Sequence, residues 1–577
     1  MVETFFRQSK TILYAKQKTI LSAATVIMFM IATSRILGLI RQRLLVHFFT
    51  PGELDTYFAA FQLPDLIFEV IVLGAMSSAF IPMFAKNLAQ KKDKQAWRLA
   101  GLILNVMLSL FLLISGLIFT FAYSLYDNVA QGFTPEQISQ TVRFTRILLL
   151  AQMFFAASYV FTAILESNQR FLTPAIAPLF YNIAIIITTI LLAPSIGLAA
   201  PVIGAVVGSF LHLAIQLPLA LSLGFRPIFS LNFKNPALRK VGKLAIPRVL
   251  ELSAFQAKRL VDLFLASQVL GGLTYFKLAD TVSVLPVSLF GLSIAKASLP
   301  QMSRQNDKDL TGFKETFVAS FRQIMFFIVP ASIFIAVLRV PIVRLAFGSS
   351  KFTWDDTLQT GYALSAFCVG IFAYALSLLV SRAFYALHDT KTPVKVSFIA
   401  ISVNIILGLV LVLGIKLPIW SLALSYSIAG VLQFSVLFEL LSKKVHGFSG
   451  FELGISFAKV LTAASFAGSL MFVLLRVLDR SAWDKKLSFL GQLGLALPTT
   501  FDRFVLDTRY TVNLIVLTAV VGLIGLTVYL AITYFLGVRE FQVFVKAIDR
   551  VPFFSPLKKI FPGPKSADPI SPEPDEI

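Results

Sequence analysis

The stretch LILNVMLSLFLLISGLIFTFA, residues 102–122, is predominantly apolar, and LIVLTAVVGLIGLTVYLAITYFL, residues 514–536, has the same character. An apolar run of about 20 residues is long enough to cross the ~30 Å hydrocarbon core of a bilayer as a helix. Backbone polar groups must be satisfied inside that core, which leaves only helices and closed barrels. Because these runs are continuous and do not alternate, they exclude a barrel. The sequence therefore predicts a helical membrane protein.

The composition of the chain points to the same class. Of the 577 residues, 57% are hydrophobic and 14% are charged, whereas soluble domains carry about 25% charged residues. A formal net charge of +21 would suit nucleic-acid binding, but the basic residues lie in short connections between apolar runs. That placement follows the positive-inside rule, so no nucleic-acid partner is expected. The single cysteine, Cys368, excludes disulfides and cysteine-rich metal sites.

Fourteen membrane spans are predicted from the apolar runs. They lie near 20–46, 55–85, 97–125, 141–167, 172–193, 198–223, 245–269, 274–302, 317–340, 358–387, 393–414, 417–442, 454–478 and 511–537. Lys and Arg cluster at the N-terminus and in the even-numbered connections, whereas the odd-numbered connections near 47–54, 126–140, 194–197 and 270–273 have none. Because loops rich in Lys and Arg stay in the cytoplasm, we expect both termini there.

Two segments are expected to lie outside the spans. The connection 479–510 mixes basic and acidic residues, and we expect an external amphipathic helix in it. The tail 539–577 begins with interleaved apolar and basic residues, which suits a helix on the anionic cytoplasmic leaflet. Its end is rich in Pro, Ser and acidic residues, a composition typical of disorder.

An internal repeat predicts two lobes. Thr56-Tyr57-Phe58 recurs as Thr274-Tyr275-Phe276 at a separation of 218 residues, and Thr173-Pro174 recurs as Thr392-Pro393 at 219. The offset covers six spans, an even number, so both copies share one membrane orientation. We expect an N-terminal lobe at 1–224 with spans one to six and a C-terminal lobe at 225–445 with spans seven to twelve. Spans thirteen and fourteen follow at 446–538, before the cytoplasmic tail at 539–577. Parallel repeats of this kind bind substrate between the lobes.

Ionisable residues interrupt spans one, two, seven and eight. Inside a bilayer such residues cost from about 2.5 to more than 10 kcal/mol and usually face a wet cavity. A cationic cavity selects an anion, and guanidinium groups bind phosphate oxygens bidentately. The candidate substrate-binding residues are Arg35, Arg41, Asp55, Lys258, Arg259, Lys277 and Lys296. Lys258 and Asp262, four residues apart, could instead pair on one helix face.

No P-loop and no catalytic constellation is found in the sequence. We therefore expect a transporter and not an enzyme. Its driving force would come from an ion gradient or from the membrane potential.

Several motifs resemble those of one known family. SRILGLIR at 34–41, followed by DTYFAAFQLP at 55–64, resembles the start of the MurJ (MviN) family. QRF at 169–171 and KTPVK at 391–395 are similar to two of its later connections. The similarity runs from about residue 24 to about residue 445. The members are lipid II flippases of peptidoglycan synthesis, within the multidrug/oligosaccharidyl-lipid/polysaccharide exporter superfamily.

The resemblance implies a bacterial inner-membrane protein with fourteen helices, two lobes and a cationic cavity for a lipid diphosphate. It also implies that Arg35 and Arg41 are functional arginines and that Asp55 is the family's acidic residue of the second span. Two family arginines are replaced, by Phe68 and Thr281. Lys277 precedes Thr281 by one helical turn, and we expect it to act as a relocated substitute.

The resemblance further implies alternating access that is helped by the membrane potential and, in some members, by sodium. Asp262 and Asn404 offer oxygen ligands for a sodium site, while Gly408 stands where a second carboxylate is expected. No other cofactor is expected. The alternative is that neither residue binds sodium: Asp262 would pair with Lys258, and Asn404 would form local hydrogen bonds.

The expected function is translocation of lipid II, a cell-wall precursor, from the inner to the outer leaflet. Two alternatives stay open: export of another polyprenyl-diphosphate-linked glycan, and a non-transporting scaffold that recruits cell-wall enzymes. The expected partners are the lipid-linked glycan, anionic membrane lipids and cell-wall synthesis proteins.

Overall fold

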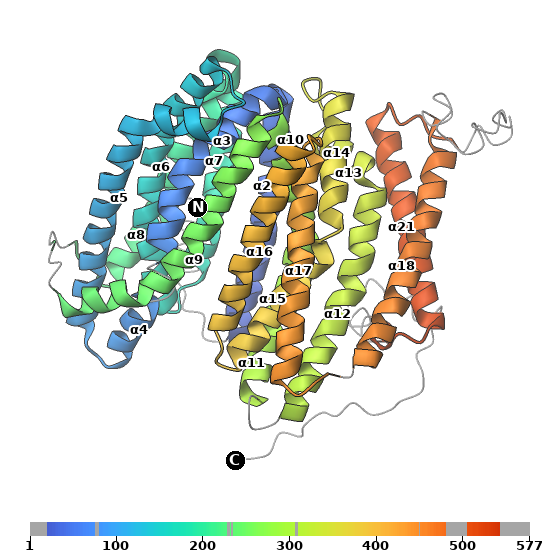
Figure 1. Ribbon diagram of the computed structural model, residues 1–577. Coiled ribbons are helices and arrows are strands. Elements are labelled where there is room, and N and C mark those ends of the chain that lie inside the picture. The colour runs from blue at the N-terminus through green and yellow to red at the C-terminus, as the bar shows by residue number, and fades with distance from the viewer. Residues whose placement is uncertain are drawn as a thin grey trace, which may run out of the picture. The chain divides into compact units, whose positions relative to one another are not determined.

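A computed structural model gives the fold (Figure 1) and describes residues 20–74, 80–227, 231, 235–305, 310–448, 450–480 and 505–542. The predictions for most of the connection 479–510 and for nearly all of the tail 539–577 lie outside the described residues. By its contacts the chain divides into two compact units. The first comprises Met1–Leu285, Leu338–Ser377 and His388–Glu439, and the second comprises Pro286–Val337, Leu378–Leu387 and Leu440–Ile577.

The first unit is built from helices, most of them long. Its N-terminal part contains α2 (Ile20–Phe48), α3 (Pro51–Ile67), the π-helical segment η1 (Phe68–Leu73), α4 (Ile81–Ala89), α5 (Asp93–Val129), α6 (Pro135–Ser167), α7 (Leu172–Ile196) and α8 (Ala199–Ser222). It continues with α9 (Pro236–Ser267), α10 (Gly272–Pro286), α13 (Arg339–Phe347), α14 (Trp354–Cys368), the start of α15 (Ile371–Ala386), α16 (Lys391–Leu409), η5 (Val410–Gly414) and most of α17 (Trp420–Lys444).

The second unit contains fewer helices in its described part. These are η3 (Val287–Gly291), α11 (Leu292–Gln305), α12 (Leu310–Val337), α18 (Gly450–Leu478) and α21 (Thr511–Phe535), with the ends of α15 and α17. Within this unit α18 packs against both α12 and α21.

Each of the fourteen predicted spans coincides with a helix or with consecutive helices. Eleven of the described helical segments are long and apolar enough to cross a membrane, and the pair α14–α15, bent by 42°, would make a twelfth. α2 and α9 also coincide with predicted spans but fall outside that set. In the described residues the structure has helices and no strand beyond one isolated bridge, between Asp479 and Leu506. An all-helical, multi-span membrane protein is therefore confirmed, while the count of fourteen and the two-lobe repeat stay predictions.

The helix starts follow from local sequence. Thr50 precedes α3, and its hydroxyl accepts a hydrogen bond from the Glu53 N–H at 3.4 Å while Glu53 Oε2 accepts one from the Thr50 N–H at 2.8 Å. Thr134 and Gln137 form the same reciprocal pair at the start of α6. These capping boxes satisfy N–H groups that a helix start leaves without a partner. Pro51 occupies the first turn of α3, where its missing N–H costs nothing.

A proline inside α3 interrupts the hydrogen bonding of a segment that lines a cavity. Pro64 has no N–H, so the carbonyl of Ala60 loses its partner within the helix. The hydroxyl of Thr145 on α6 donates to that carbonyl at 3.0 Å and ties the two helices together. The α-helix then continues into the wider π-helical segment η1, whose first residues are Phe68 and Glu69. Such π-helical segments are frequent at functional sites.

α7 and α8 pack closely through a glycine on α8. A Cβ atom at Gly208 would lie 2.9 Å from the Cα of Tyr181 on α7, closer than real Cβ contacts allow. Small residues at helix interfaces permit such backbone approach in membranes. Gly208 therefore lets α8 pack directly against the α7 backbone at Tyr181.

In the second unit a proline is compensated in the same way. Pro330 lies inside α12, so the carbonyl of Phe326 lacks an N–H donor four residues later. The buried hydroxyl of Tyr529 on α21 donates to this carbonyl at 2.7 Å. The bond joins α21 to α12 within this unit.

Candidate functional site

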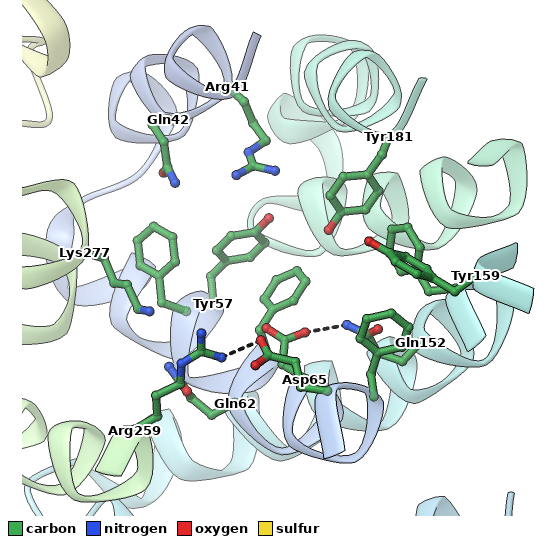
Figure 2. A pocket seen from close by; sticks show the side chains of 15 residues that line it. Arg41, Gln42, Tyr57, Gln62, Asp65, Gln152, Tyr159, Tyr181, Arg259 and Lys277 are labelled. Carbon is green, nitrogen blue, oxygen red and sulfur yellow. Dashed lines mark hydrogen bonds and ion pairs between the residues drawn. The ribbon is translucent and has the colours of Figure 1, made fainter. Parts of the chain in front are cut away.

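A polar cavity of about 410 Å³ lies within the first unit (Figure 2). Its lining side chains come from α2, α3, η1, α6, α7, α9 and α10. They are Arg41, Gln42, Tyr57, Phe58, Phe61, Gln62, Asp65, Phe68, Glu69, Gln152, Phe155, Tyr159, Tyr181, Arg259 and Lys277. The volume falls within the roughly 300–1,000 Å³ of typical ligand pockets.

One group of charges in the cavity is already paired. Arg259 NH1 lies 2.7 Å from Glu69 Oε1, and Gln256 Nε2 donates to Glu69 Oε2 at 2.6 Å. Asp65 Oδ1 accepts a hydrogen bond from Gln152 Nε2 at 2.5 Å. The Arg259–Glu69 pair neutralises itself, so it adds little net charge to the cavity.

Two further cations in the cavity form no ion pair with a carboxylate of the described residues. The ammonium of Lys277 forms no hydrogen bond or ion pair among these residues, although the carboxylate of Asp280 attracts it electrostatically. Arg41 NH1 donates to the neutral Asn182 Oδ1 at 3.0 Å, and its guanidinium lies 6.0 Å from the ring centroid of Tyr181. With three cations against two carboxylates, Asp65 and Glu69, the lining is cationic when all of them are ionised.

A second cavity of about 390 Å³ adjoins the first and shares Arg41, Gln42 and Tyr181 with it. Arg35, Asp280 and Thr281 also line it. Arg41 therefore borders both cavities.

The structure brings together part of the predicted substrate site. Arg41, Arg259 and Lys277 line the first cavity, and Arg35 lines the second. Phe68 lines the first cavity and Thr281 the second, so both positions where this chain departs from the family pattern face a cavity. Lys277 and Thr281 line different, adjoining cavities, and the role of Lys277 as a relocated substitute for an arginine at 281 stays a prediction.

The remaining predicted substrate residues lie elsewhere. Asp55 lines neither cavity; its buried carboxylate bonds to the backbone at the start of α10. Lys258 forms an ion pair with Asp262 and lies 5.1 Å from the ring centroid of Tyr426. Lys296 belongs to α11 in the second unit. A substrate role for these three residues stays a prediction.

The predicted sodium ligands have protein partners. Asp262 is paired with Lys258, and Asn404 Nδ2 donates to Ser425 Oγ at 3.4 Å. A Cβ at Gly408 would lie 3.0 Å from a methyl carbon of Leu265, so a carboxylate there would need that side chain to shift. In the described part of the chain, no group of three or more His, Cys, Asp or Glu residues is arranged to hold a metal ion.

Sequence reasoning missed the neutral polar half of the cavity lining. It selected charged residues, because charge in a span is expensive, but it did not assign Asp65 and Glu69 to the site. The missed residues are Gln42, Gln62, Gln152, Tyr57, Tyr159 and Tyr181. A glutamine inside an apolar run was the available signal, since its amide also needs a partner in a bilayer.

A multi-span helical fold whose spans enclose a charged cavity is typical of membrane transport proteins. The motifs and the fold of this chain then identify the particular kind. The chain belongs to the family described as lipid II flippase MurJ, whose model matches residues 15–493.

Individual relatives agree with this assignment. A lipid II flippase MurJ of Thermosipho africanus is 30% identical over 428 residues, covering 72% of this chain and 85% of the relative. A probable lipid II flippase MurJ of Haemophilus influenzae is 26% identical over 534 residues, covering 89% and 99%. A solved structure of a lipid II flippase MurJ in an inward closed conformation is similar in fold, with a TM-score of 0.71 at 24% identity over 89% of this chain and 98% of that one.

Proposed function

We propose that this protein moves lipid II from the inner to the outer leaflet of the bacterial cytoplasmic membrane. Membership of the MurJ family supports the substrate. The observation that carries the proposal is the pair of cations, Arg41 and Lys277, that face one cavity and form no ion pair among the described residues.

These two cations suit a diphosphate that is bound and then released. A guanidinium offers a planar fork to phosphate oxygens, and an ammonium acts as a mobile point charge. Each Arg41 or Lys277 contact to an ionised phosphate is a charge-assisted hydrogen bond, which is worth about 1.5–3 kcal/mol. Contacts of this strength hold the head group and still permit its release on the other side.

Transport would proceed by alternating access, in which the two halves of a repeat fold rock around one site. The Asp55 carboxylate bonds α3 to the start of α10. These helices belong to the two halves of the predicted repeat, so we expect this bond to open when the halves move apart. Both termini would lie in the cytoplasm, where the basic connections and the anionic leaflet attract each other.

The driving force would be the membrane potential, a sodium gradient or both. Asp262 and Asn404 would have to exchange their present partners to bind sodium. Transport that is unchanged when Na⁺ is replaced by choline would exclude sodium coupling. Transport that survives collapse of the membrane potential would exclude the potential as the driving force.

The test of the proposed function is a reconstituted assay with the full chain. Proteoliposomes would carry lipid II in the inner leaflet, and its arrival outside would be followed with an enzyme or probe that cannot cross the membrane. We expect accumulation outside to exceed that of protein-free vesicles. Equal rates in both would contradict the proposal and favour a non-transporting scaffold. Faster movement of another polyprenyl-diphosphate-linked glycan than of lipid II would favour the other alternative.

A further inference from the structure

Three buried polar atoms in the cavity lining have no hydrogen-bond partner among the described residues. They are Arg41 Nε, Gln42 Oε1 and Gln152 Oε1. The residues Gln42 and Gln152 are more than nine-tenths buried, with relative exposures of 8% and 5%. A buried polar atom without a partner costs free energy, so it is usually satisfied by water or by a ligand.

The chemistry of the missing partner follows from Gln152. Its amide nitrogen donates to Asp65 Oδ1 at 2.5 Å. This bond leaves Oε1 as an acceptor that has no donor among the described residues. An ionised diphosphate offers only acceptor oxygens, so it cannot fill this position. A sugar hydroxyl or an acetamido N–H can.

Aromatic rings form the wall next to Gln152. Figure 2 shows Tyr159 and Tyr181 on one side of the cavity, with Arg259 and Lys277 on the opposite side. The hydroxyls of Tyr159 and Tyr181 have no hydrogen-bond partner in the described residues, and the Phe155 and Tyr181 ring centroids lie 5.0 Å apart. Aromatic rings present a flat apolar surface with a polar tip, which matches a pyranose ring with its hydroxyl groups.

Neighbouring side chains of α6 and α8 hold the ring of Tyr159 in position. The ring of His212 on α8 stacks against it, with centroids 6.0 Å apart and an interplanar angle of 13°. Ser158 Oγ lies 2.7 Å from His212 Nδ1, and Gln216 Nε2 donates to Ser158 Oγ at 2.8 Å. A buried network whose members satisfy one another holds its side chains rigidly, so Tyr159 is held in place before a ligand arrives.

We propose that Gln152, Tyr159 and Tyr181 form a saccharide subsite for the sugar attached directly to the diphosphate of the substrate. Arg41 and Lys277 bind the diphosphate, and the aromatic side of the same cavity binds the first sugar ring. The ring stacks on the aromatic wall, and Gln152 Oε1 accepts a hydrogen bond from its hydroxyl or acetamido group. This subsite rests on the proposed function, because it specifies how the lipid-linked substrate is recognised.

The test compares two ligands on the purified full chain in detergent. One ligand is lipid II, and the other is the same polyprenyl diphosphate without sugars. We expect Gln152→Leu and Tyr159→Leu each to weaken lipid II binding about tenfold, the equivalent of one good hydrogen bond or stacking contact. Binding of the sugar-free lipid should not change. Arg41→Ala should weaken the binding of both ligands.

Two controls keep the result interpretable. Gln433→Leu removes a glutamine of α17 that donates to Ser397 Oγ at 3.1 Å and lines neither cavity, so it should change neither affinity. Tyr159→Leu keeps the Gln152–Asp65 bond, which covers the case in which Gln152→Leu fails to fold.

The outcomes separate the subsite from the flippase. Equal weakening of both ligands by Gln152→Leu and Tyr159→Leu, or no weakening of either, would overturn the subsite. Sugar-dependent binding without any translocation in proteoliposomes would support the subsite and overturn the flippase proposal alone.

Discussion

The carboxylate of Asp55 at the start of α3 binds the start of α10 at Thr274. Oδ1 accepts hydrogen bonds from the Thr274 N–H at 2.8 Å and from its hydroxyl at 2.7 Å, while Oδ2 accepts one from the Gly271 N–H at 2.7 Å. All three donors belong to a helix N-terminus, where the partial positive charge favours an anion. Asp55 therefore caps a helix that lies 219 residues away in sequence.

Asp55→Asn should lower the thermal stability of the detergent-solubilised protein, because the carboxylate contributes charge-assisted bonds worth about 1.5–3 kcal/mol each and the amide cannot accept with both ends. Thr274→Val should lower it less, since only the hydroxyl bond is lost. Asp127→Asn, at an exposed position of α5, serves as the control. A melting temperature of Asp55→Asn equal to that of Asp127→Asn would contradict the capping role.

Arg41→Ala and Lys277→Ala should each slow lipid II transport by roughly one to two orders of magnitude, following the loss of about 1.5–3 kcal/mol per charge-assisted contact. Arg41→Lys should also be slow, because the planar fork is lost. Arg248→Ala is the matched control: Arg248 pairs with Glu251 at 2.7 Å on the surface of α9 and lines neither cavity. Transport at the normal rate by both cavity variants would rule out these two cations as the diphosphate site.

Thr281→Arg should not restore transport to Lys277→Ala. Thr281 lines the second cavity beside Arg35 and Asp280, whereas Lys277 lines the first. An arginine at 281 would meet the carboxylate of Asp280 there and leave the first cavity short of a cation. Transport by the double variant in proteoliposomes provides the measurement, with Lys277→Ala and Thr281→Arg alone for comparison. Recovery to the wild-type rate would show that the two cavities act as one site.

Gly208→Leu should destabilise the protein by about 1–3 kcal/mol, the usual cost of overpacking. Its Cβ would meet the Tyr181 backbone at 2.9 Å, and α7 would have to move away from α8. Because Tyr181 lines both cavities, lipid II binding should weaken as well. Gly116→Ala, where nothing lies within 4 Å of the added carbon, should leave both thermal stability and binding unchanged or raise stability slightly. Equal behaviour of the two variants would refute the close-packing argument.

Tyr529→Phe should cost about 1 kcal/mol of stability, since it removes the hydroxyl that satisfies the Phe326 carbonyl. Pro330→Ala would supply the missing backbone N–H to the same carbonyl. In the Pro330→Ala background, Tyr529→Phe should therefore cost much less, and a double-mutant cycle of melting temperatures measures the difference. An unchanged cost in both backgrounds would show that the hydroxyl does not replace the proline's lost hydrogen bond.

The sequence by itself determined the membrane class and the helical fold, and each predicted span coincides with a helix or with consecutive helices. Apolar runs such as 102–122 and 514–536 indicate a membrane environment. In hydrocarbon a continuous apolar run must form a helix, because the helix satisfies its own backbone hydrogen bonds. The sequence also marked Arg41 and Lys277, since a cation inside a span is costly wherever the chain folds.

Only the tertiary structure decided which of these residues share a cavity. Arg41 and Lys277 lie on α2 and α10, far apart in sequence, and the packing of α2, α3, α6, α7, α9 and α10 brings them to one space. The same packing leaves Asp55 capping α10 and Lys258 paired with Asp262. It also leaves Gln152 Oε1 without a partner. A glutamine in an apolar run looks the same in sequence whether its amide is satisfied or free, because its partners come from other helices.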